Sequence, residues 1–256
     1  MILIKLGGSV ITDKTQYRTF SRDSVSRLCR EISASGRDCL VVHGAGSFGH
    51  VLAKRFSIQD GFTGKEQIPA VAKVQHDVRE LSSMVVGELI DAGIPAVSVP
   101  PGSCFVMDGG RLEVGNGDAI RALKDMGIMP VMFGDVVMDR KKGFGICSGD
   151  QAMEVLARIF EPELSIFVSD IDGLYLSDPK KDPDAEFIPE VTEETLERIS
   201  SEQSADDVTG GVAGKMRSML SMCAEGRECI LLNGTVPGRL LSALNGEKIR
   251  CTTARV

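Results

Sequence analysis

Two glycine-rich segments have the residue types that phosphate chemistry requires. Gly7-Gly8-Ser9 follows the apolar run Ile2–Leu6, and the segment 44–49 (GAGSFG) follows the apolar run Cys39–Val42. Glycine lets the backbone approach an anion closely, and free N–H groups at a helix start point at that anion. Either segment alone could be only a tight turn. Two of them at the ends of neighbouring strands, with lysines nearby, predict loops that surround a phosphate chain.

Three lysines accompany these glycines. Lys5 lies inside an apolar run, where an unpaired ammonium would be costly, Lys14 follows Thr12-Asp13, and Lys215 follows the glycine pair that ends at Gly211. Phosphoryl transfer needs positive charge around the transferred oxygens and little covalent chemistry from the protein. Any one of these lysines could be a solvated surface residue. Together they indicate a phosphoryl-transfer site.

Two acidic segments extend the candidate site. Asp150, in Ser148-Gly149-Asp150, either caps a helix that begins there or holds the lysines in place. Asp170 follows the apolar run Leu164–Ser169, which suits a turn, a nucleotide pocket or both.

His50 is the most informative of the three histidines. It stands one residue past the second glycine loop, where a donor can hold a phosphate or an oxyanion, although a solvent-facing position at a helix start is the simpler alternative. His43 is expected at a strand end and His76 on a helix surface.

The sequence does not match the two common nucleotide-binding motifs, the P-loop and the Rossmann dinucleotide motif. GxxxxGK[ST] is absent from the sequence. The segment 44–49 spells GxGxxG after a strand, but about 20 residues further on the chain enters a helical pattern at Glu66 instead of a second strand that ends in an acid. A dinucleotide oxidoreductase is therefore a weak alternative.

Short apolar runs alternate with helical patterns along the chain, which predicts an α/β protein with a mostly parallel sheet covered on both faces. A helix is expected after an N-cap at Ser21, a long helix over Glu66–Ile90, and a hairpin over Val136–Cys147. The expected strands are Ile2–Leu6, Cys39–Val42, Pro95–Val99, Ile128–Phe133, Leu164–Ser169 and Glu228–Leu232. A proline- and charge-rich stretch near 175–190 marks a soft boundary inside one domain, 1–256. We expect a substrate-binding lobe over about residues 1–165 and a nucleotide-binding lobe over about 166–256.

Composition excludes several classes of protein. The 256 residues carry a formal net charge of −7, which gives no sign of a nucleic-acid-binding face. The seven cysteines include no CxxC pair, which argues for a reducing compartment and against a disulfide framework or a zinc site. The N-terminus is too short and glycine-rich for a signal peptide, and no apolar run reaches the roughly 18 residues that span a bilayer. We expect a cytoplasmic protein without a membrane or nucleic-acid partner.

Five motifs together resemble the amino acid kinase superfamily: KLGGS from Lys5, HGAGSFGH up to His50, SGD up to Asp150, SDIDGLY up to Tyr175, and TGGVAGK up to Lys215. The closing GEKIRCTT also looks like the last strand of that family, so the resemblance covers essentially the whole chain. ITDK combined with the terminal histidine of HGAGSFGH is similar to the isopentenyl phosphate kinase branch, whereas acetylglutamate, carbamate and uridylate kinases mostly lack that histidine.

The resemblance implies an open αβα sandwich, usually a homodimer, with ATP bound over the C-terminal half. It implies that Lys5 and Lys14 steady the transferring phosphoryl group, and that His50 donates to the phosphate of the substrate. It further assigns catalysis to Lys5, Lys14, His50, Asp150 and Lys215. It assigns ATP binding to Lys5, Gly7, Gly8, Ser9, Gly46, Asp170, Tyr175, Gly211 and Lys215. It assigns substrate binding to Gly8, Ala45, His50 and Gly149.

The implied reaction converts ATP and isopentenyl phosphate into ADP and isopentenyl diphosphate, a step of isoprenoid biosynthesis by an alternative mevalonate pathway. A phosphate nucleophile is ionised at neutral pH, so no strong general base is required. Mg²⁺ is expected with ATP, held mostly by phosphates and water, with no protein ligand for the metal. A wall for the isoprenoid tail could come from the long helix, although core packing is the simpler role for these residues: Val74, Val78, Leu81, Met84 and Val85.

Two departures from the family pattern and two rival functions remain. Gln151 stands where a second acid is expected, and Cys251-Thr252 stands where Gly-Thr is usual. A fosfomycin-type phosphonate kinase shares the glycine loops and the histidine. A non-catalytic nucleotide sensor is the rival from another class, although it would not need the lysine set.

Overall fold

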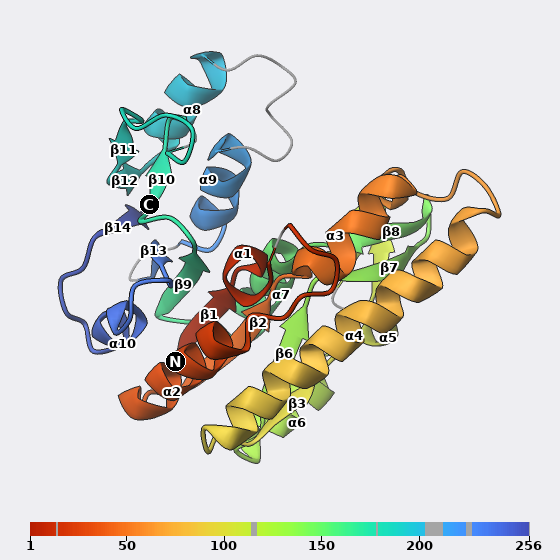
Figure 1. The fold of residues 1–256 in the computed structure, drawn as a ribbon, viewed down its shortest axis with the longest axis horizontal. Helices are drawn as coiled ribbons and strands as arrows, with labels where there is room; N and C mark the ends of the chain where they lie inside the picture. Colours follow the sequence, from red (N-terminus) through yellow and green to blue (C-terminus); the bar gives the residue numbers. More distant parts are fainter. Residues whose placement is uncertain (14, 114–116, 178, 203–211, 224–226, 256) are drawn as a thin grey trace.

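The computed structural model describes residues 1–13, 15–113, 117–177, 179–202, 212–223 and 227–255. Its centre is an eight-stranded sheet in the order β12-β14-β13-β9-β1-β2-β6-β3 (Figure 1). β14 pairs antiparallel with β13, and the pairs from β13 through β9, β1, β2 and β6 to β3 are parallel. The strands are β1 (Ile2–Leu6), β2 (Cys39–His43), β3 (Ala96–Ser98), β6 (Met129–Phe133), β9 (Leu164–Ser169), β12 (Glu190–Val191), β13 (Glu228–Asn233) and β14 (Cys251–Ala254). The predicted α/β fold with a mostly parallel sheet is confirmed.

Helices cover both faces of this sheet, which is why every residue of β1, β2 and β6 is buried. α2 (Arg22–Ser35) and α4 (Gln67–Asp91) lie in front of the sheet in Figure 1, next to α3 (Gly46–Arg55) and α10 (Arg239–Leu244). The other face carries α6 (Asp118–Asp125), α7 (Gly149–Phe160) and α9 (Val212–Leu220). Shorter or peripheral helices are α1 (Gly8–Ile11), α5 (Pro101–Cys104), the 3-10 turn Ile58–Asp60 and α8 (Glu193–Glu202).

The two helices expected from the sequence are present. α2 follows an N-cap at Ser21, although the Ser21 side chain makes no capping hydrogen bond. α4 buries a stripe at helical spacing against the sheet, including Val74, Val78 and Leu81.

A second sheet, in the order β5-β4-β7-β8, projects from the main sheet beside α3 and α4. Its hairpin joins β7 (Asp135–Asp139) to β8 (Gly143–Cys147), as predicted, whereas β4 (Val106–Asp108) and β5 (Arg111–Glu113) were not predicted. The hairpin turn is held by Asp139, whose carboxylate accepts N–H groups from Gly109, Gly110, Lys141 and Lys142.

The stretch near 175–190 contains a small hairpin of β10 (Leu174–Tyr175) and β11 (Phe187–Ile188). Thr252, next to Cys251 at one of the departures from the family pattern, is buried against it. The Thr252 Oγ1 accepts from the Leu174 N–H at 2.7 Å and donates to the Ile188 carbonyl at 2.5 Å. The main sheet contains strands that precede this stretch in sequence, such as β9, and strands that follow it, such as β13 and β14. Thr252 of β14 anchors the stretch to the sheet. None of the helices in the described part of the chain is long and apolar enough to cross a membrane.

Candidate active site

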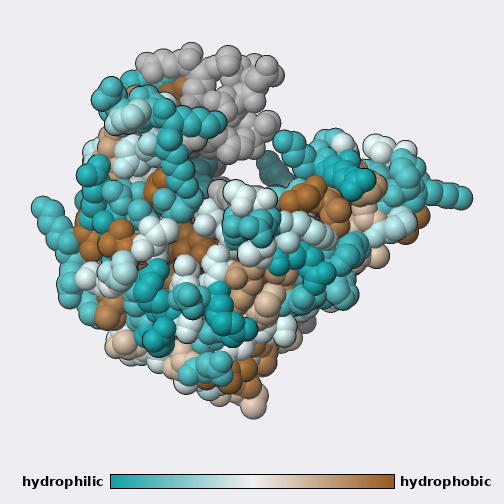
Figure 2. All heavy atoms as spheres, viewed as in Figure 1, coloured by the Kyte–Doolittle hydropathy of each residue, from teal (hydrophilic) through white to brown (hydrophobic). Residues whose placement is uncertain are grey.

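A cavity of about 420 Å³ lies at the carboxyl ends of β9, β1, β2 and β6. Residues directly after three of these strands line it, namely Gly7, Gly44 and Gly134, together with Ser169 at the end of β9. The surface in Figure 2 is hollowed on the side where α3 and α9 face each other. Because ligands of open parallel sheets bind beyond the carboxyl ends of the strands, this cavity is the candidate active site.

The two glycine loops meet in backbone contact at the floor of the cavity. A Cβ atom on Gly8 would lie 2.8 Å from both the N and the Cα of Gly46. Gly46 has a φ of +50°, and a Cβ there would lie 2.3 Å from the Thr12 Oγ1. Only glycine allows this approach without displacing a backbone. The two loops are therefore close enough to contact one phosphate chain together.

Two helices begin at the cavity. α3 begins at Gly46 and α7 begins at Gly149, and both residues line the cavity. The first N–H groups of a helix have no intrahelical acceptor and carry partial positive charge. These helix starts can therefore receive phosphate oxygens without a side chain.

Lys5 reaches the cavity from the buried strand β1 and forms an ion pair with Asp150. Its side chain is 11% exposed, and its ammonium lies 5.3 Å from the centre of the Phe167 ring. Asp150 lies in the first turn of α7, whose N-cap is Ser148, with the Ser148 hydroxyl accepting the Gln151 N–H at 3.2 Å. Of the two roles considered for Asp150, the structure shows the contact with Lys5 and gives the cap to Ser148.

His50 is the fifth residue of α3, is exposed, and lines the cavity. The wall next to it is apolar and includes Ala53 of α3 and Val74 and Val78 of α4. Of the five residues considered for a tail wall, only Val74 and Val78 line the cavity; Leu81 and Val85 are buried in the core, and Met84 is partly buried against it.

The cavity also contains most of the other predicted residues. Lys215 lines it from α9, on the side away from α4, and Gly7, Gly8, Ser9 and Ala45 line it from the loops. Asp170 and Tyr175 do not line it: Asp170 pairs with Lys180, and Tyr175 packs edge-on against Phe187 with ring centres 5.3 Å apart. Lys14 and Gly211 lie outside the described residues.

Sequence reasoning missed the contribution of β6 and of the hairpin after it. Gly134 and Asp135 line the cavity, and Ile146 and Cys147 line it from β8. Asp135 is buried and accepts N–H groups from Gly102 at 2.9 Å and from Val136 at 2.8 Å. Burial raises the pKa of Asp135 above its ordinary value, against these hydrogen bonds and the Arg79 charge. A glycine directly after the expected strand 128–133 was the available signal.

The two other histidines lie where they were expected. His76 is exposed on α4. His43 ends β2, is fully buried, and stacks on Phe133 with ring centres 5.1 Å apart. Burial lowers the pKa of His43 to about 4, while its Nδ1 lies 2.9 Å from the Gly44 carbonyl. A neutral His43 ring with Nδ1 protonated donates to that carbonyl and so holds the first residue of the glycine loop in place.

Gln151, the second position that departs from the family pattern, faces away from the cavity. Its Nε2 donates to the Gly110 carbonyl at 2.9 Å, so it ties α7 to the turn between β4 and β5. The Gln151 Oε1 is buried, with no hydrogen-bond partner among the described residues.

This fold and this cavity define a kinase, and the chain belongs to the amino acid kinase family, whose family model matches residues 1–233. Kinases of this family use ATP. Within the family, the chain belongs with the isopentenyl phosphate kinases. It is 38% identical to the isopentenyl phosphate kinase of Methanothermobacter thermautotrophicus over 98% of both chains, and 35% identical to that of Thermoplasma acidophilum over 94% of both chains.

Solved structures agree with the sequence relatives. A structure of an isopentenyl phosphate kinase superposes with a TM-score of 0.84 at 35% identity, covering 99% of each chain. A substrate complex of an isopentenyl phosphate kinase superposes with a TM-score of 0.82 at 30% identity, covering all of both chains. The resemblance noted from the motifs is confirmed, as is the αβα fold that it implied.

Proposed function

We propose that the protein transfers the γ-phosphoryl group of ATP to isopentenyl phosphate, giving isopentenyl diphosphate and ADP. The observation that carries the proposal is the arrangement around one cavity. His50 and an apolar wall of α4 lie together, and the glycine loops and the Lys5–Asp150 pair lie beside them. A phosphorylated acceptor with a short apolar tail has both a charged and an apolar end to satisfy, and this cavity offers both kinds of surface.

His50 binds the phosphate of the acceptor in this proposal, together with the backbone of Ala45, Gly8 and Gly149. The apolar tail lies against Val74 and Val78. An oxygen of the acceptor phosphate attacks the γ-phosphorus, and the bond from that phosphorus to the bridging oxygen of ADP breaks. Because the attacking oxygen already carries negative charge, the protein needs no strong base.

The positive groups stabilise the transferred phosphoryl group, whose charge is spread over its outer oxygens. Lys5 is held by Asp150, so its ammonium is oriented before ATP binds. Lys215 and Lys14 contribute further charge, and Gly7, Gly8, Ser9 and Gly46 bind the ATP phosphates through backbone groups. The assignment of Asp170, Tyr175 and Gly211 to ATP binding stays a prediction, because Asp170 and Tyr175 do not line the cavity and Gly211 lies outside the described residues. ATP then lies over residues 166–256 and the acceptor over residues 1–165.

Mg²⁺ fits this arrangement as a partner of the ATP phosphates. The two carboxylates that line the cavity are already engaged, Asp150 by Lys5 and Asp135 by backbone N–H groups. Phosphate oxygens and water are therefore the ligands that this cavity leaves to the metal, which neutralises phosphate charge when it is bound. We further propose a cytoplasmic homodimer that has no nucleic-acid or membrane partner.

The test is a coupled ADP-release assay with ATP, Mg²⁺ and either isopentenyl phosphate or fosfomycin, on wild type and on His50→Ala. Turnover of isopentenyl phosphate that collapses in His50→Ala supports the proposal. Turnover of fosfomycin alone would replace the acceptor while keeping the kinase assignment. Hydrolysis of ATP without phosphorylation of either acceptor would contradict the proposed function.

A further inference from the structure

The segment between α1 and α2 closes on itself as a loop beside the cavity. Thr12 and Phe20 form an antiparallel bridge, and the Asp13 N–H donates to the Thr19 carbonyl at 3.0 Å. The Ser21 N–H donates to the Ile11 carbonyl at 2.9 Å. The described residues of this loop, 12–13 and 15–20, thus have a closed base next to α1. We call them the 12–20 loop.

The base of the 12–20 loop is tied to both glycine loops of the site. The Thr12 hydroxyl donates to the Gly8 carbonyl at 2.7 Å and accepts the Ser47 N–H at 3.0 Å. The Thr19 N–H donates to the Ser47 hydroxyl at 3.4 Å. Hydrogen bonds therefore couple this loop to the backbone of both glycine loops.

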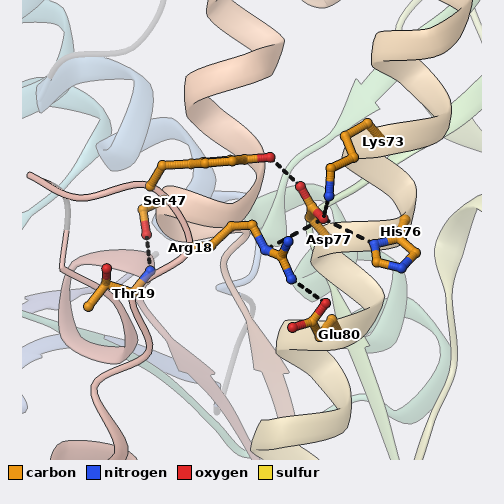
Figure 3. Close-up of polar contacts among 8 residues, drawn as sticks. Arg18, Thr19, Ser47, Lys73, His76, Asp77 and Glu80 are labelled. Atoms are coloured by element: carbon orange, nitrogen blue, oxygen red, sulfur yellow. Dashed lines mark hydrogen bonds and ion pairs between the residues drawn. The ribbon is translucent and has the colours of Figure 1, made fainter.

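The outer part of the 12–20 loop is tied to α4 through one carboxylate. The Tyr17 hydroxyl donates to Asp77. The Arg18 Nε lies 3.6 Å from the Asp77 Oδ1, and Figure 3 shows the Arg18 side chain directed at this carboxylate. Arg18 also pairs with Glu80, one turn further along α4. Arg18 has a φ of +58°, which is unfavourable for a residue with a side chain and is maintained only by its surroundings.

Asp77 is buried and ionised at the centre of these contacts. Its side chain is 0% exposed and also receives Lys73 at 2.5 Å and His76 at 3.1 Å. Burial by itself would raise the pKa of Asp77, but the hydrogen bonds from Lys73, Tyr17 and His76 and the Arg18 charge lower it below its ordinary value. Burial and the contact with Asp77 raise the pKa of Tyr17 to about 12, so its hydroxyl stays a donor at neutral pH.

Asp77 occupies a particular place on α4. It lies between Val74 and Val78, the two residues of this helix that line the cavity. The same turn of helix therefore contacts the cavity with its apolar side chains and holds the 12–20 loop with its carboxylate.

We propose that Asp77 is a positioning residue for phosphoryl transfer: through Tyr17 and Arg18 it fixes the 12–20 loop, and that loop fixes the relative position of the Gly8 and Gly46 loops. The proposal rests on the phosphoryl transfer proposed above. An acceptor that packs against Val74 and Val78 is thereby aligned with the phosphate-binding backbone. Asp77 itself does not line the cavity.

Kinetics separate this role from a purely structural one. Asp77→Asn and Tyr17→Phe are compared with Glu88→Gln, whose carboxylate is also buried on α4 (6% exposed) and paired with an arginine, Arg22, but holds no part of the 12–20 loop. We expect the first two variants to lose about 10- to 100-fold in kcat for isopentenyl phosphate, because a misplacement near 1 Å costs about that much. The KM for ATP should stay within about twofold. All three variants should lower Tm by similar amounts, but Glu88→Gln should leave kcat unchanged. An unchanged kcat in Asp77→Asn and Tyr17→Phe would overturn the proposal.

Hydrogen exchange provides a readout that does not depend on the acceptor. Amides of the loops 7–9 and 44–49 should exchange faster in Asp77→Asn than in Glu88→Gln. Equal exchange in the two variants would refute the positioning role even if the wild-type enzyme used a different acceptor. Faster exchange with no turnover of isopentenyl phosphate by wild type would retain the positioning role and reject the proposed acceptor.

Discussion

Replacing Asp150 by alanine tests how Lys5 is held. The variant leaves the Lys5 ammonium, whose side chain is only 11% exposed, without its carboxylate partner. Breaking a fully buried ion pair costs about 3–5 kcal/mol. Because the Asp150 side chain is 26% exposed and water can replace part of its contact, we expect a loss of about 2 kcal/mol in the free energy of unfolding.

The catalytic effect of Asp150→Ala should be a change in kcat rather than in ATP binding. An unheld lysine side chain has several rotamers, and a misplacement near 1 Å costs about 100-fold in rate, or about 2.7 kcal/mol. Removing a negative charge from a phosphate-binding cavity should leave the KM for ATP unchanged or lower it. The pair of results, a low kcat with an undiminished affinity for ATP, distinguishes positioning from direct binding.

Steady-state kinetics and urea unfolding of Asp150→Ala measure both quantities. Gln151→Ala is the matched control, since Gln151 lies next to Asp150 in α7 but contacts Gly110 instead of Lys5. The control should keep kcat within about threefold. A wild-type kcat in Asp150→Ala, or a large increase in the KM for ATP as its main defect, would refute this role of Asp150.

Three further predictions follow from single side chains. Gly46→Ala should abolish measurable ATP turnover and lower Tm, because its Cβ would lie 2.3 Å from the Thr12 Oγ1 at a φ of +50°. Gly87→Ala in α4 is the control: a Cβ there meets nothing within 4 Å, so this variant should keep wild-type turnover. His43 should make stability fall in acid: its folded pKa is about 4 against an ordinary 6.5, so the unfolded chain takes up a proton first as the pH drops through this window. The loss should approach about 3 kcal/mol, and His43→Gln should remove that part of the pH dependence of urea unfolding; equal pH dependence in the two proteins would contradict the assignment. Val78→Phe should raise the KM for isopentenyl phosphate at least tenfold with the KM for ATP unchanged, and an unchanged acceptor KM would place the tail elsewhere.

The sequence predicted the parts of the site that follow from local chemistry and sheet topology. Glycines after Leu6 and after His43 stand at the ends of parallel neighbours, so their meeting follows once β1 and β2 pair. Lys5 inside an apolar strand would be costly without a partner, and Asp150, at an expected helix start, was considered as a residue that holds the lysines. These inferences needed no long-range geometry beyond the order of the strands.

Other parts depend on contacts between distant segments. Asp77 interrupts the apolar face of α4, which signals a buried charge, but its partner Tyr17 lies 60 residues away in sequence. Asp170 was predicted at the site but does not line the cavity. It follows a cavity residue, Ser169, yet its side chain pairs with Lys180. Motif position locates a backbone, whereas the direction of a side chain depends on the groups that surround it.

Phosphorus NMR of the wild-type protein with ATP, Mg²⁺ and isopentenyl phosphate tests the central claim most directly. The isopentenyl phosphate resonance should be replaced by the two coupled resonances of a diphosphate ester, with ADP formed in equal amount. Formation of ADP and inorganic phosphate, with the isopentenyl phosphate resonance unchanged, would contradict this claim.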